Sequence, residues 1–230
     1  MNGADLRTVV KSLVLAKGFD KVSVAPANAA KAPPPWTQSV LVTAVAALDE
    51  AFDYQIFLAY GKHRRWHKFA YEIIVAQAYQ AASALMSVGM RAEPLIYEDS
   101  FAIIDLREAA IQAGLGARGL NGLVVTPEFG PRVRLGAIFV DAALEPDSPW
   151  DDYPCASCTR CWSACPTRAL GPDGFDRARC LAEFAPDADM IARQKRMLRS
   201  LTAHTRRQCI SCVVSCPVGR VPTETFYAAP

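Results

Sequence analysis

Two cysteine runs in the last third of the chain constrain its fold more than any other feature. The first, C-x2-C-x2-C-x3-C-P, spans 155–166, and the second, C-x2-C-x3-C-P, spans 209–217. All 8 cysteines of the 230-residue chain lie between Cys155 and Cys216. Disulfides require an oxidising compartment, and the N-terminal residues have apolar side chains at helical spacing with charges between them, unlike a signal peptide. The thiols therefore indicate a metal site.

The first run has the spacing with which bacterial proteins bind paired 4Fe–4S clusters. In that pattern three thiolates on one loop hold one cluster and the fourth reaches another, while the proline turns the chain away. Aligning the two runs at their prolines leaves only Cys180 for the position that the second run lacks. The predicted ligands are Cys155, Cys158, Cys161 and Cys216 for one cluster and Cys165, Cys180, Cys209 and Cys212 for the other.

Zinc is the alternative occupant, because C-x2-C pairs also bind tetrahedral Zn²⁺. Zinc sites usually pair their cysteines two by two. Three cysteines on one short loop with a distant fourth favour the cluster, and so does the proline after each run.

The residues before the cysteines are numerous enough for a folded domain of their own. We predict an N-terminal helix, buried strands and a long helix ending at Gly89, followed by a helix that Asp105 caps. The predicted strands cover 21–25, 39–48, 123–126 and 133–141, and the long helix covers 66–89. We place a boundary near residue 150, with a mixed α/β domain over 1–150 and a small cysteine-rich domain over 151–230.

The overall charge and hydropathy exclude some classes of partner. The formal net charge is +2, which provides no global argument for nucleic acid, and no apolar run approaches the ~18 residues that span a bilayer. We therefore expect a cytoplasmic protein with no membrane partner.

The segment 186–207 between the cysteine runs is locally basic. It has two acids against six cations, namely Arg193, Lys195, Arg196, Arg199, Arg206 and Arg207. One interpretation is a solvated helix face with cations at its C-terminal end. The other is a docking surface for an acidic electron donor or a phosphate-bearing substrate.

Three cysteine segments resemble the cluster domain of epoxyqueuosine reductase: "CASCTRCWSACPTRAL", "RARCLAEF", which carries Cys180, and "CISCVVSCP". The segment 112–141 before them is similar to its counterpart in that family and in reductive dehalogenases. The resemblance implies an α+β protein, with a nitroreductase-like α/β domain followed by a ferredoxin-like domain with two 4Fe–4S clusters. It also implies cobalamin and an external low-potential donor of the ferredoxin or flavodoxin type.

The resemblance suggests further site residues in the first domain. Gly114, Gly116 and Gly119 would let the backbone approach a corrinoid closely, or they end a helix and form a turn. Asp99 in "YEDSF" lies close to the position of the family's proposed proton donor, or it is a surface carboxylate, and Tyr97 is another possible donor.

Two functions stay open from the sequence. One is a cobalamin-dependent reductase acting on a small molecule or a modified nucleoside. The other is an electron-transfer module that reduces a partner's corrinoid or flavin, and a flavin in the chain's own pocket is a third, weaker possibility. Epoxyqueuosine reductase continues into a helical-repeat tRNA-binding region, whereas this chain ends soon after Pro217, so a tRNA substrate is doubtful.

Overall fold

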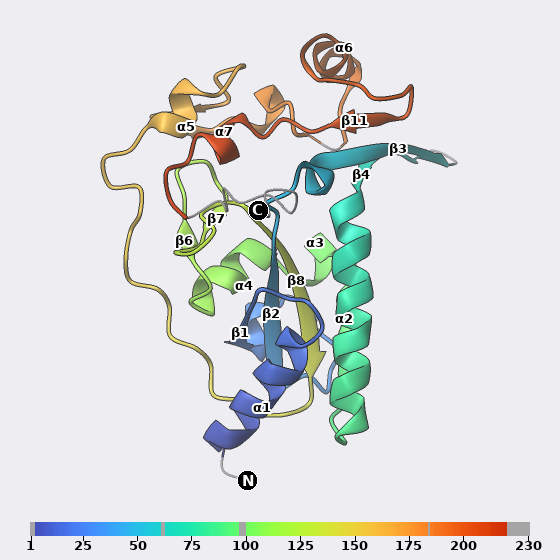
Figure 1. The fold of residues 1–230 in the computed structure, drawn as a ribbon, viewed down its shortest axis with the longest axis vertical. Helices are drawn as coiled ribbons and strands as arrows, with labels where there is room; N and C mark the ends of the chain where they lie inside the picture. The colour runs from blue at the N-terminus through green and yellow to red at the C-terminus, as the bar shows by residue number, and fades with distance from the viewer. Residues whose placement is uncertain (1–2, 61–62, 97–99, 184, 220–230) are drawn as a thin grey trace, which may run out of the picture.

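The centre of the protein is a four-stranded antiparallel sheet with strand order β1-β2-β8-β5 (Figure 1). The computed structural model describes residues 3–60, 63–96, 100–183 and 185–219. The two middle strands pair from Ser39 opposite Val140 to Ala46 opposite Val133. The predicted strands at 21–25, 39–48 and 133–141 are confirmed, with slightly different ends. The four strands are β1 (Lys21–Pro26), β2 (Ser39–Ala46), β8 (Val133–Val140) and β5 (Ala92–Pro94).

Helices cover both faces of this sheet, which explains the largely apolar sequence of β2. Side chains alternate between the two faces of a strand. Leu41 and Val45 belong to one core with α1 (Gly3–Leu15) and α2 (Phe69–Ser87). Val40, Val42 and Ala44 belong to a second core with α4 (Leu106–Gln112) on the opposite face. Because both faces of the sheet are buried, β2 does not alternate between polar and apolar residues. The arrangement of helices on a sheet confirms the mixed α/β prediction.

Local signals position the helices on the sheet. The Asp105 carboxylate accepts hydrogen bonds from the backbone N–H of Arg107 at 3.0 Å and of Glu108 at 3.4 Å, which confirms it as the cap of α4. Gly89, just after α2, has a φ of +86°, as expected at the end of a helix. In β8, a Cβ on Gly136 would lie 2.7 Å from Ile74 Cγ2, so the missing side chain lets α2 lie close to the sheet.

The long helix begins later than predicted. The sequence predicts a helix from 66, but α2 begins at Phe69, and the preceding residues form β4 (His63–Lys68) in a hairpin with β3 (Tyr54–Tyr60). In this hairpin Phe57 and Trp66 lie opposite each other, with ring centroids 5.1 Å apart. Such cross-strand aromatic pairs favour a hairpin, which here outweighs the helical pattern.

Short elements complete the chain, including the strand predicted at 123–126, which is two residues long. Before residue 150 they are η1 (Ala27–Ala29), η2 (Glu50–Asp53), α3 (Ser100–Ile103), β6 (Ala117–Arg118) and β7 (Val124–Val125). After it they are α5 (Arg160–Ser163), β9 (Leu170–Gly171), β10 (Gly174–Phe175), η3 (Arg177–Arg179), α6 (Ala188–Met197), β11 (Thr205–Arg207) and α7 (Ser211–Val214).

One small sheet joins two parts of the chain that are far apart in sequence. β11, which follows Cys180 in sequence, pairs antiparallel with β3, with Thr205 opposite Ile56 and Arg207 opposite Tyr54. The sheet order is β11-β3-β4, and it lies between the cysteine region at the top of Figure 1 and the main sheet below. The cysteine region is therefore fixed to the first part of the chain by backbone pairing.

An extended segment leads from the main sheet to the cysteines along one side of the molecule (Figure 1). Asp147 fixes it to β1: its backbone N–H donates to the carbonyl of Val24 at 2.9 Å, and its carboxylate accepts from the Val24 N–H at 2.7 Å. Lys11 also donates to this carboxylate. Across the described ranges, no helix is both long enough and apolar enough to cross a bilayer.

Candidate metal centre

The two cysteine loops have the same backbone geometry. In the first, Cys165 N–H donates to the carbonyl of Trp162 at 3.1 Å, and in the second, Cys216 N–H donates to that of Val213 at 3.2 Å. The residues that precede their single helical turns, Thr159 and Ile210, have φ/ψ of −118°/15° and −126°/15°. The chain thus repeats one structural unit, in the alignment that the prolines predict.

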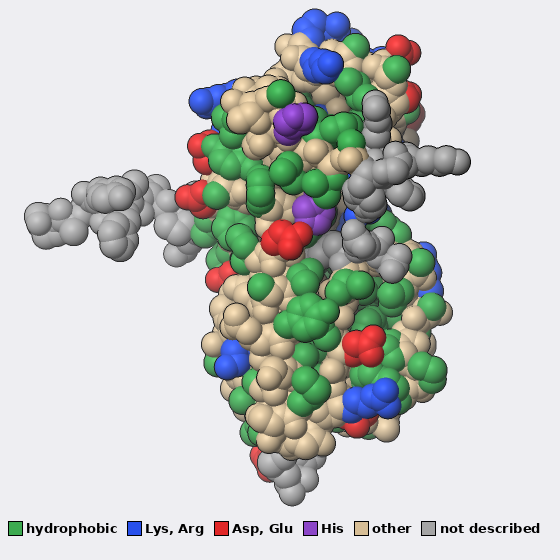
Figure 2. Space-filling view, turned by 90° about the vertical axis from the view of Figure 1, so that its right-hand side faces the viewer, with side chains coloured by type: hydrophobic (Ala, Val, Ile, Leu, Met, Phe, Trp, Pro, Cys, Tyr) green, Lys and Arg blue, Asp and Glu red, His purple; other side chains and the backbone are tan. Residues whose placement is uncertain are grey.

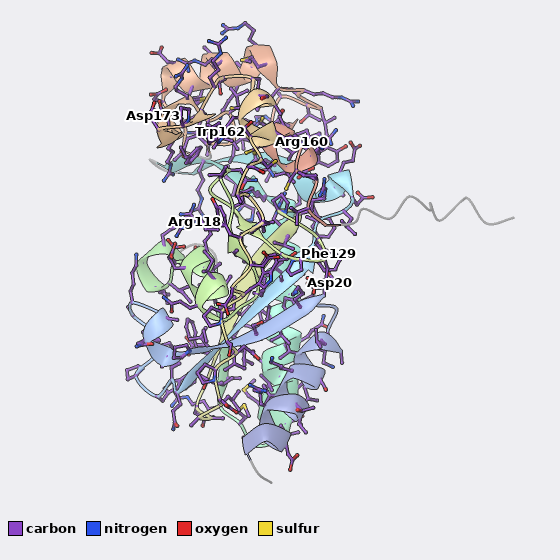
Figure 3. The ribbon with its side chains drawn as sticks, turned by 90° about the vertical axis from the view of Figure 1, so that its left-hand side faces the viewer. Asp20, Arg118, Phe129, Arg160, Trp162 and Asp173 are labelled. Carbon is purple, nitrogen blue, oxygen red and sulfur yellow. The ribbon has the colours of Figure 1, made fainter. Side chains whose placement is uncertain are left out.

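The loops lie against each other at the upper end of the molecule. The short helices α5 and α7 are in contact. Figure 3 shows Arg160 and Trp162 of α5 above Phe129, which belongs to the loop between β7 and β8. All eight cysteines are free thiols, and Cys155 and Cys161 are buried.

The thiols of the first group influence one another's pKa. Burial raises the pKa of Cys161, and the neighbouring thiolates of Cys155 and Cys158 raise it further. Burial also raises the pKa of Cys216, with a contribution from the same two neighbours. These four cysteines are the first predicted ligand set.

The second group behaves in the same way. Burial raises the pKa of Cys180, with contributions from Cys209 and Cys165. Burial and the thiolates of Cys209, Cys180, Cys161 and Cys165 raise the pKa of Cys212 to about 12. Cys212 is thus near every other member of the second predicted set and also near Cys161 of the first.

Such raised pKa values are those of thiols that would be neutral without a metal. Iron binding would deprotonate them and remove the mutual repulsion. Among the described residues, no three His, Cys, Asp or Glu side chains converge on a point that would bind a single metal ion. The assignment of the thiols to two clusters stays a prediction.

Cys165 differs from the other thiols because its surroundings favour the thiolate. Burial raises its pKa, but backbone N–H groups of Thr167, Ala169 and Leu170 and the Thr167 hydroxyl lower it below the usual value. The Ala169 N–H donates to Cys165 Sγ at 3.2 Å. Amide donors of this kind suit a thiolate that ligates a cluster.

Arg132, at the start of β8, supports the second cysteine loop and was not identified from the sequence. Its guanidinium donates to the carbonyls of Val214, Cys216 and Val218, at 3.4, 3.2 and 3.3 Å. Gly130 lies so close to the Val218 carbonyl that a Cβ would overlap it. The loop between β7 and β8 thus holds the chain around Cys216.

A buried polar cluster lies beneath the hairpin β3–β4 and was also missed. Arg134 donates to the Asp53 carboxylate at 2.8 Å, and both side chains are about nine-tenths buried. Gln208, beside Cys209, donates to the same carboxylate at 3.3 Å. Burial raises the pKa of Asp53, although Arg134 and Gln208 act to lower it. Arg134 is the one charge within the otherwise apolar sequence of β8, and this is the signal that could have revealed a buried partner.

Lys68, at the end of β4, is a further cation near the cysteines. Burial lowers the pKa of Lys68 to about 7, and nearby Arg134 adds to this effect, while Asp53 and Cys180 act in the opposite direction. His67 also lies on β4, with its Nε2 2.6 Å from the Glu72 carboxylate.

The three predicted corrinoid glycines contact the chain itself. A Cβ on Gly114, whose φ is +66°, would overlap the Ser148 carbonyl. A Cβ on Gly116 would lie 2.5 Å from the Val125 carbonyl oxygen, and one on Gly119 would lie 2.6 Å from Asn121 Oδ1. Their lack of side chains is thus explained by packing, and their contact with a corrinoid stays a prediction. Asp99 and Tyr97 lie outside the described residues.

Comparison with known proteins gives sequence relatives of two kinds, although no protein-family model matches the chain. Over 162 residues, 67% of the chain, it is 30% identical to a tetrachloroethene reductive dehalogenase of Desulfitobacterium hafniense and covers 28% of it. Over 130 residues, 56% of the chain, it is 37% identical to an epoxyqueuosine reductase of Lactococcus garvieae and covers 36% of it. The chain therefore spans roughly a third of the length of these relatives.

Solved structures of both kinds share the fold. An epoxyqueuosine reductase with a modified tRNA stem loop matches 94% of the chain, with a TM-score of 0.68 and 22% identity, and the chain covers 66% of it. A catabolic reductive dehalogenase in complex with 3-bromo-4-hydroxybenzoic acid matches 92%, with a TM-score of 0.62 and 17% identity, and the chain covers 31% of it. The chain is thus a homologue of the epoxyqueuosine reductases and the reductive dehalogenases over part of their length, and it shares their fold.

Proposed function

We propose that the chain is an oxidoreductase that takes up electrons through two 4Fe–4S clusters to reduce a substrate bound at its α/β domain. The observation that supports this proposal is the repeated backbone geometry of the two cysteine loops, whose short helices α5 and α7 are in contact. When bound, such clusters supply one-electron transfer at low potential. The relatives are named reductases, which supports the same reaction class.

The residues of the chain hold and tune the metal centres. Four thiolates would bind each cluster, and the amide donors around Cys165 would stabilise negative charge on its sulfur. Arg132 holds the Cys216 loop by three carbonyls and places a positive charge near its thiol, which lowers that thiol's pKa against the effect of burial. The Cys161 thiolate raises the pKa of Cys212, so the two proposed ligand sets would come near each other at these two residues.

A corrinoid is proposed as the further cofactor because of the relatives. One structural neighbour is described as a reductive dehalogenase with B12-dependent dehalogenation. Atoms of the chain itself occupy the space beside the three glycines that the sequence suggests for a corrinoid site. No described residue is therefore assigned to the corrinoid. Asp99 and Tyr97 are retained as proposed proton donors.

The proposed substrate is a small organic molecule or a modified nucleoside. One neighbour binds an epoxyqueuosine-modified tRNA stem loop and another binds a halogenated hydroxybenzoate, so the fold serves both. An electron-transfer module with no substrate of its own is the second candidate. The pairing of β11 with β3 favours it, because it fixes the cysteine region to the rest of the chain whether or not a cofactor binds.

Purification without oxygen tests the proposal. We expect about eight irons per chain with the broad visible absorption of iron–sulfur clusters. We also expect cobalt to be retained in a stoichiometric amount after incubation with cobalamin and gel filtration. Iron without cobalamin binding would leave the electron-transfer module. One or two zinc ions and no iron would contradict both functions.

A further inference from the structure

The helix α6 and the residues after it form a cationic surface at the end of the molecule that carries the cysteines. Lys195, Arg196 and Arg199 are exposed there, beside the exposed apolar side chains of Met197 and Leu201. Figure 2 shows Lys and Arg side chains gathered at this upper end. These residues are called the α6 surface below.

The position of α6 is fixed, so its cations are held facing solvent. Gln194, on the inner face of the helix, is buried, and its side-chain amide donates to the carbonyls of Leu181 at 3.1 Å and Glu183 at 2.9 Å. Met190 is buried on the same face. The inner face therefore rests on the segment just after Cys180.

The cations of the α6 surface are not neutralised within the described part of the chain. There, Lys195, Arg196 and Arg199 form no ion pair, whereas neighbouring Arg207 pairs with Glu50 at 3.0 Å. The acid at the start of the helix, Asp187, is used as its cap and accepts from the Met190 N–H at 2.7 Å. The positive charge is thus available to an external partner.

A hollow of about 280 Å³ adjoins these cations and reaches one of the predicted ligands. Its lining is mostly apolar, and it includes both a cation of the surface and a thiol. Residues that line it include Leu181, Met197, Leu198, Arg199, Ile210 and Cys209. A molecule seated here would lie against the cysteine group that contains Cys209.

We infer that the α6 surface binds a small acidic electron-carrier protein, which reduces the cluster held by Cys165, Cys180, Cys209 and Cys212. This inference rests on the proposed function, because it requires that cluster. The carrier loses one electron and the cluster gains one, and no bond forms or breaks. Complementary charge steers such encounters, and redox interfaces are often small and weak, which suits a surface of this extent.

An RNA partner is less consistent with the same surface. Phosphates would pair with the cations, but single-stranded bases are recognised by stacking on aromatic side chains. None of the described residues that line the hollow is aromatic. A protein partner would use both the cations and the apolar lining, whereas RNA would use only the cations.

The test compares the anaerobically purified holoprotein with the double variant Lys195→Glu/Arg196→Glu and with Lys17→Glu as a charge-reversal control outside the α6 surface. Lys17 follows α1, a helix that lies far from α6 (Figure 1). The probe is an acidic flavodoxin, titrated against each protein in its oxidised form. We expect affinity to fall about tenfold or more in the double variant at low salt, to change less than about twofold in the control, and to weaken with salt in the wild type.

A second measurement separates this inference from the proposed function. Reduced flavodoxin should reduce the clusters of the double variant more slowly, whereas dithionite should reduce wild type and variant equally. Equal flavodoxin binding by wild type and the double variant, with full iron in both, would overturn the inference alone. Loss of binding to an RNA stem loop without any change toward flavodoxin would also overturn it. A wild-type protein without iron would instead contradict the proposed function.

Discussion

The guanidinium of Arg206 lies over the ring of Trp66, with its central carbon 3.8 Å from the ring centroid. Arg206 belongs to the basic segment 186–207, and Trp66 lies on the hairpin before α2. The guanidinium also donates to Gln55 Oε1 at 2.9 Å and to the Glu183 carbonyl at 3.2 Å. Burial lowers the pKa of Arg206 to about 9. A single buried cation thus links β3, β4 and the Cys180 segment.

The Trp66–Arg206 contact should be measurable as a coupling energy. We expect the double-mutant cycle of Trp66→Leu and Arg206→Met to give about 1 kcal/mol of coupling in the free energy of unfolding, because a desolvated cation over an indole is stabilising. Urea unfolding of the four proteins measures it. The control cycle pairs Arg206→Met with Phe57→Leu, since Phe57 is the aromatic residue that contacts the Trp66 ring. Equal coupling in both cycles would contradict the prediction.

The buried Asp53–Arg134 pair should show the cost of an unpaired internal charge. Asp53→Ala leaves Arg134 buried without its carboxylate, and we expect the protein to lose about 3–5 kcal/mol of unfolding free energy. Asp53→Ala/Arg134→Met should recover at least half of that loss. Glu128→Ala, which breaks the exposed ion pair with Lys21, should cost less than about 1 kcal/mol. The prediction fails if the double variant is as unstable as the single one.

Arg132 should matter for retention of iron as well as for stability. Arg132→Ala removes three hydrogen bonds to the Cys216 loop, and we expect a loss of about 1–3 kcal/mol in unfolding free energy together with faster removal of iron by a chelator. Arg132→Lys keeps the charge but not the fork of donors, so its effect should be intermediate. Arg118→Ala, which breaks a surface pair with Glu108, is the control. Identical chelation rates in all four proteins would exclude this role for Arg132.

The iron content of a Cys180 variant tests the second predicted ligand set. Cys180→Ala should reduce the iron content by about half, because the other predicted set retains its four thiolates. Arg179→Ala, an exposed neighbour in the same loop, should leave the iron content unchanged. Iron analysis of anaerobically purified proteins measures both. Full iron in Cys180→Ala would show that this thiol is not a ligand.

The packing of Gly114 has a testable cost. A Cβ there would overlap the Ser148 carbonyl in addition to adopting a positive φ, so Gly114→Ala should lose more than about 2 kcal/mol of unfolding free energy. Gly174→Ala also places a side chain at positive φ, but in open space, and should cost about 1 kcal/mol. Equal losses would show that backbone conformation alone accounts for the effect at Gly114.

The features that the sequence predicted well are those coded by a short stretch of chain. The apolar runs of β2 and β8, the Asp105 cap and the repeated cysteine loops each depend on residues close together in sequence. The cysteine spacing also predicted that the two loops repeat one backbone geometry, whereas the assignment of the thiols to two ligand sets stays a prediction. The identity of the bound metal stays a prediction.

The features that were missed depend on residues far apart. The sequence predicts a helix from residue 66, but residues 66–68 belong to β4, because this strand gains its stability from Phe57 and from the pairing of β11 with β3. Arg132 gains its partners only when the residues before β8 meet the Cys216 loop, and Asp53 gains Arg134 only when η2 lies beside β8. Their residue types alone suggested no such role.

The pairing of β11 with β3 has a consequence for the maturation of the protein. Cys180 and Cys209 flank β11 in sequence, so their attachment to one cluster would tie the ends of the segment that contains this strand. Closing that loop early would reduce the entropy lost when β11 meets β3. Chains made under iron starvation would then complete the small sheet slowly and would present the open edge of β3 to other chains. Iron supply would thus govern both the redox capacity and the solubility of newly made protein.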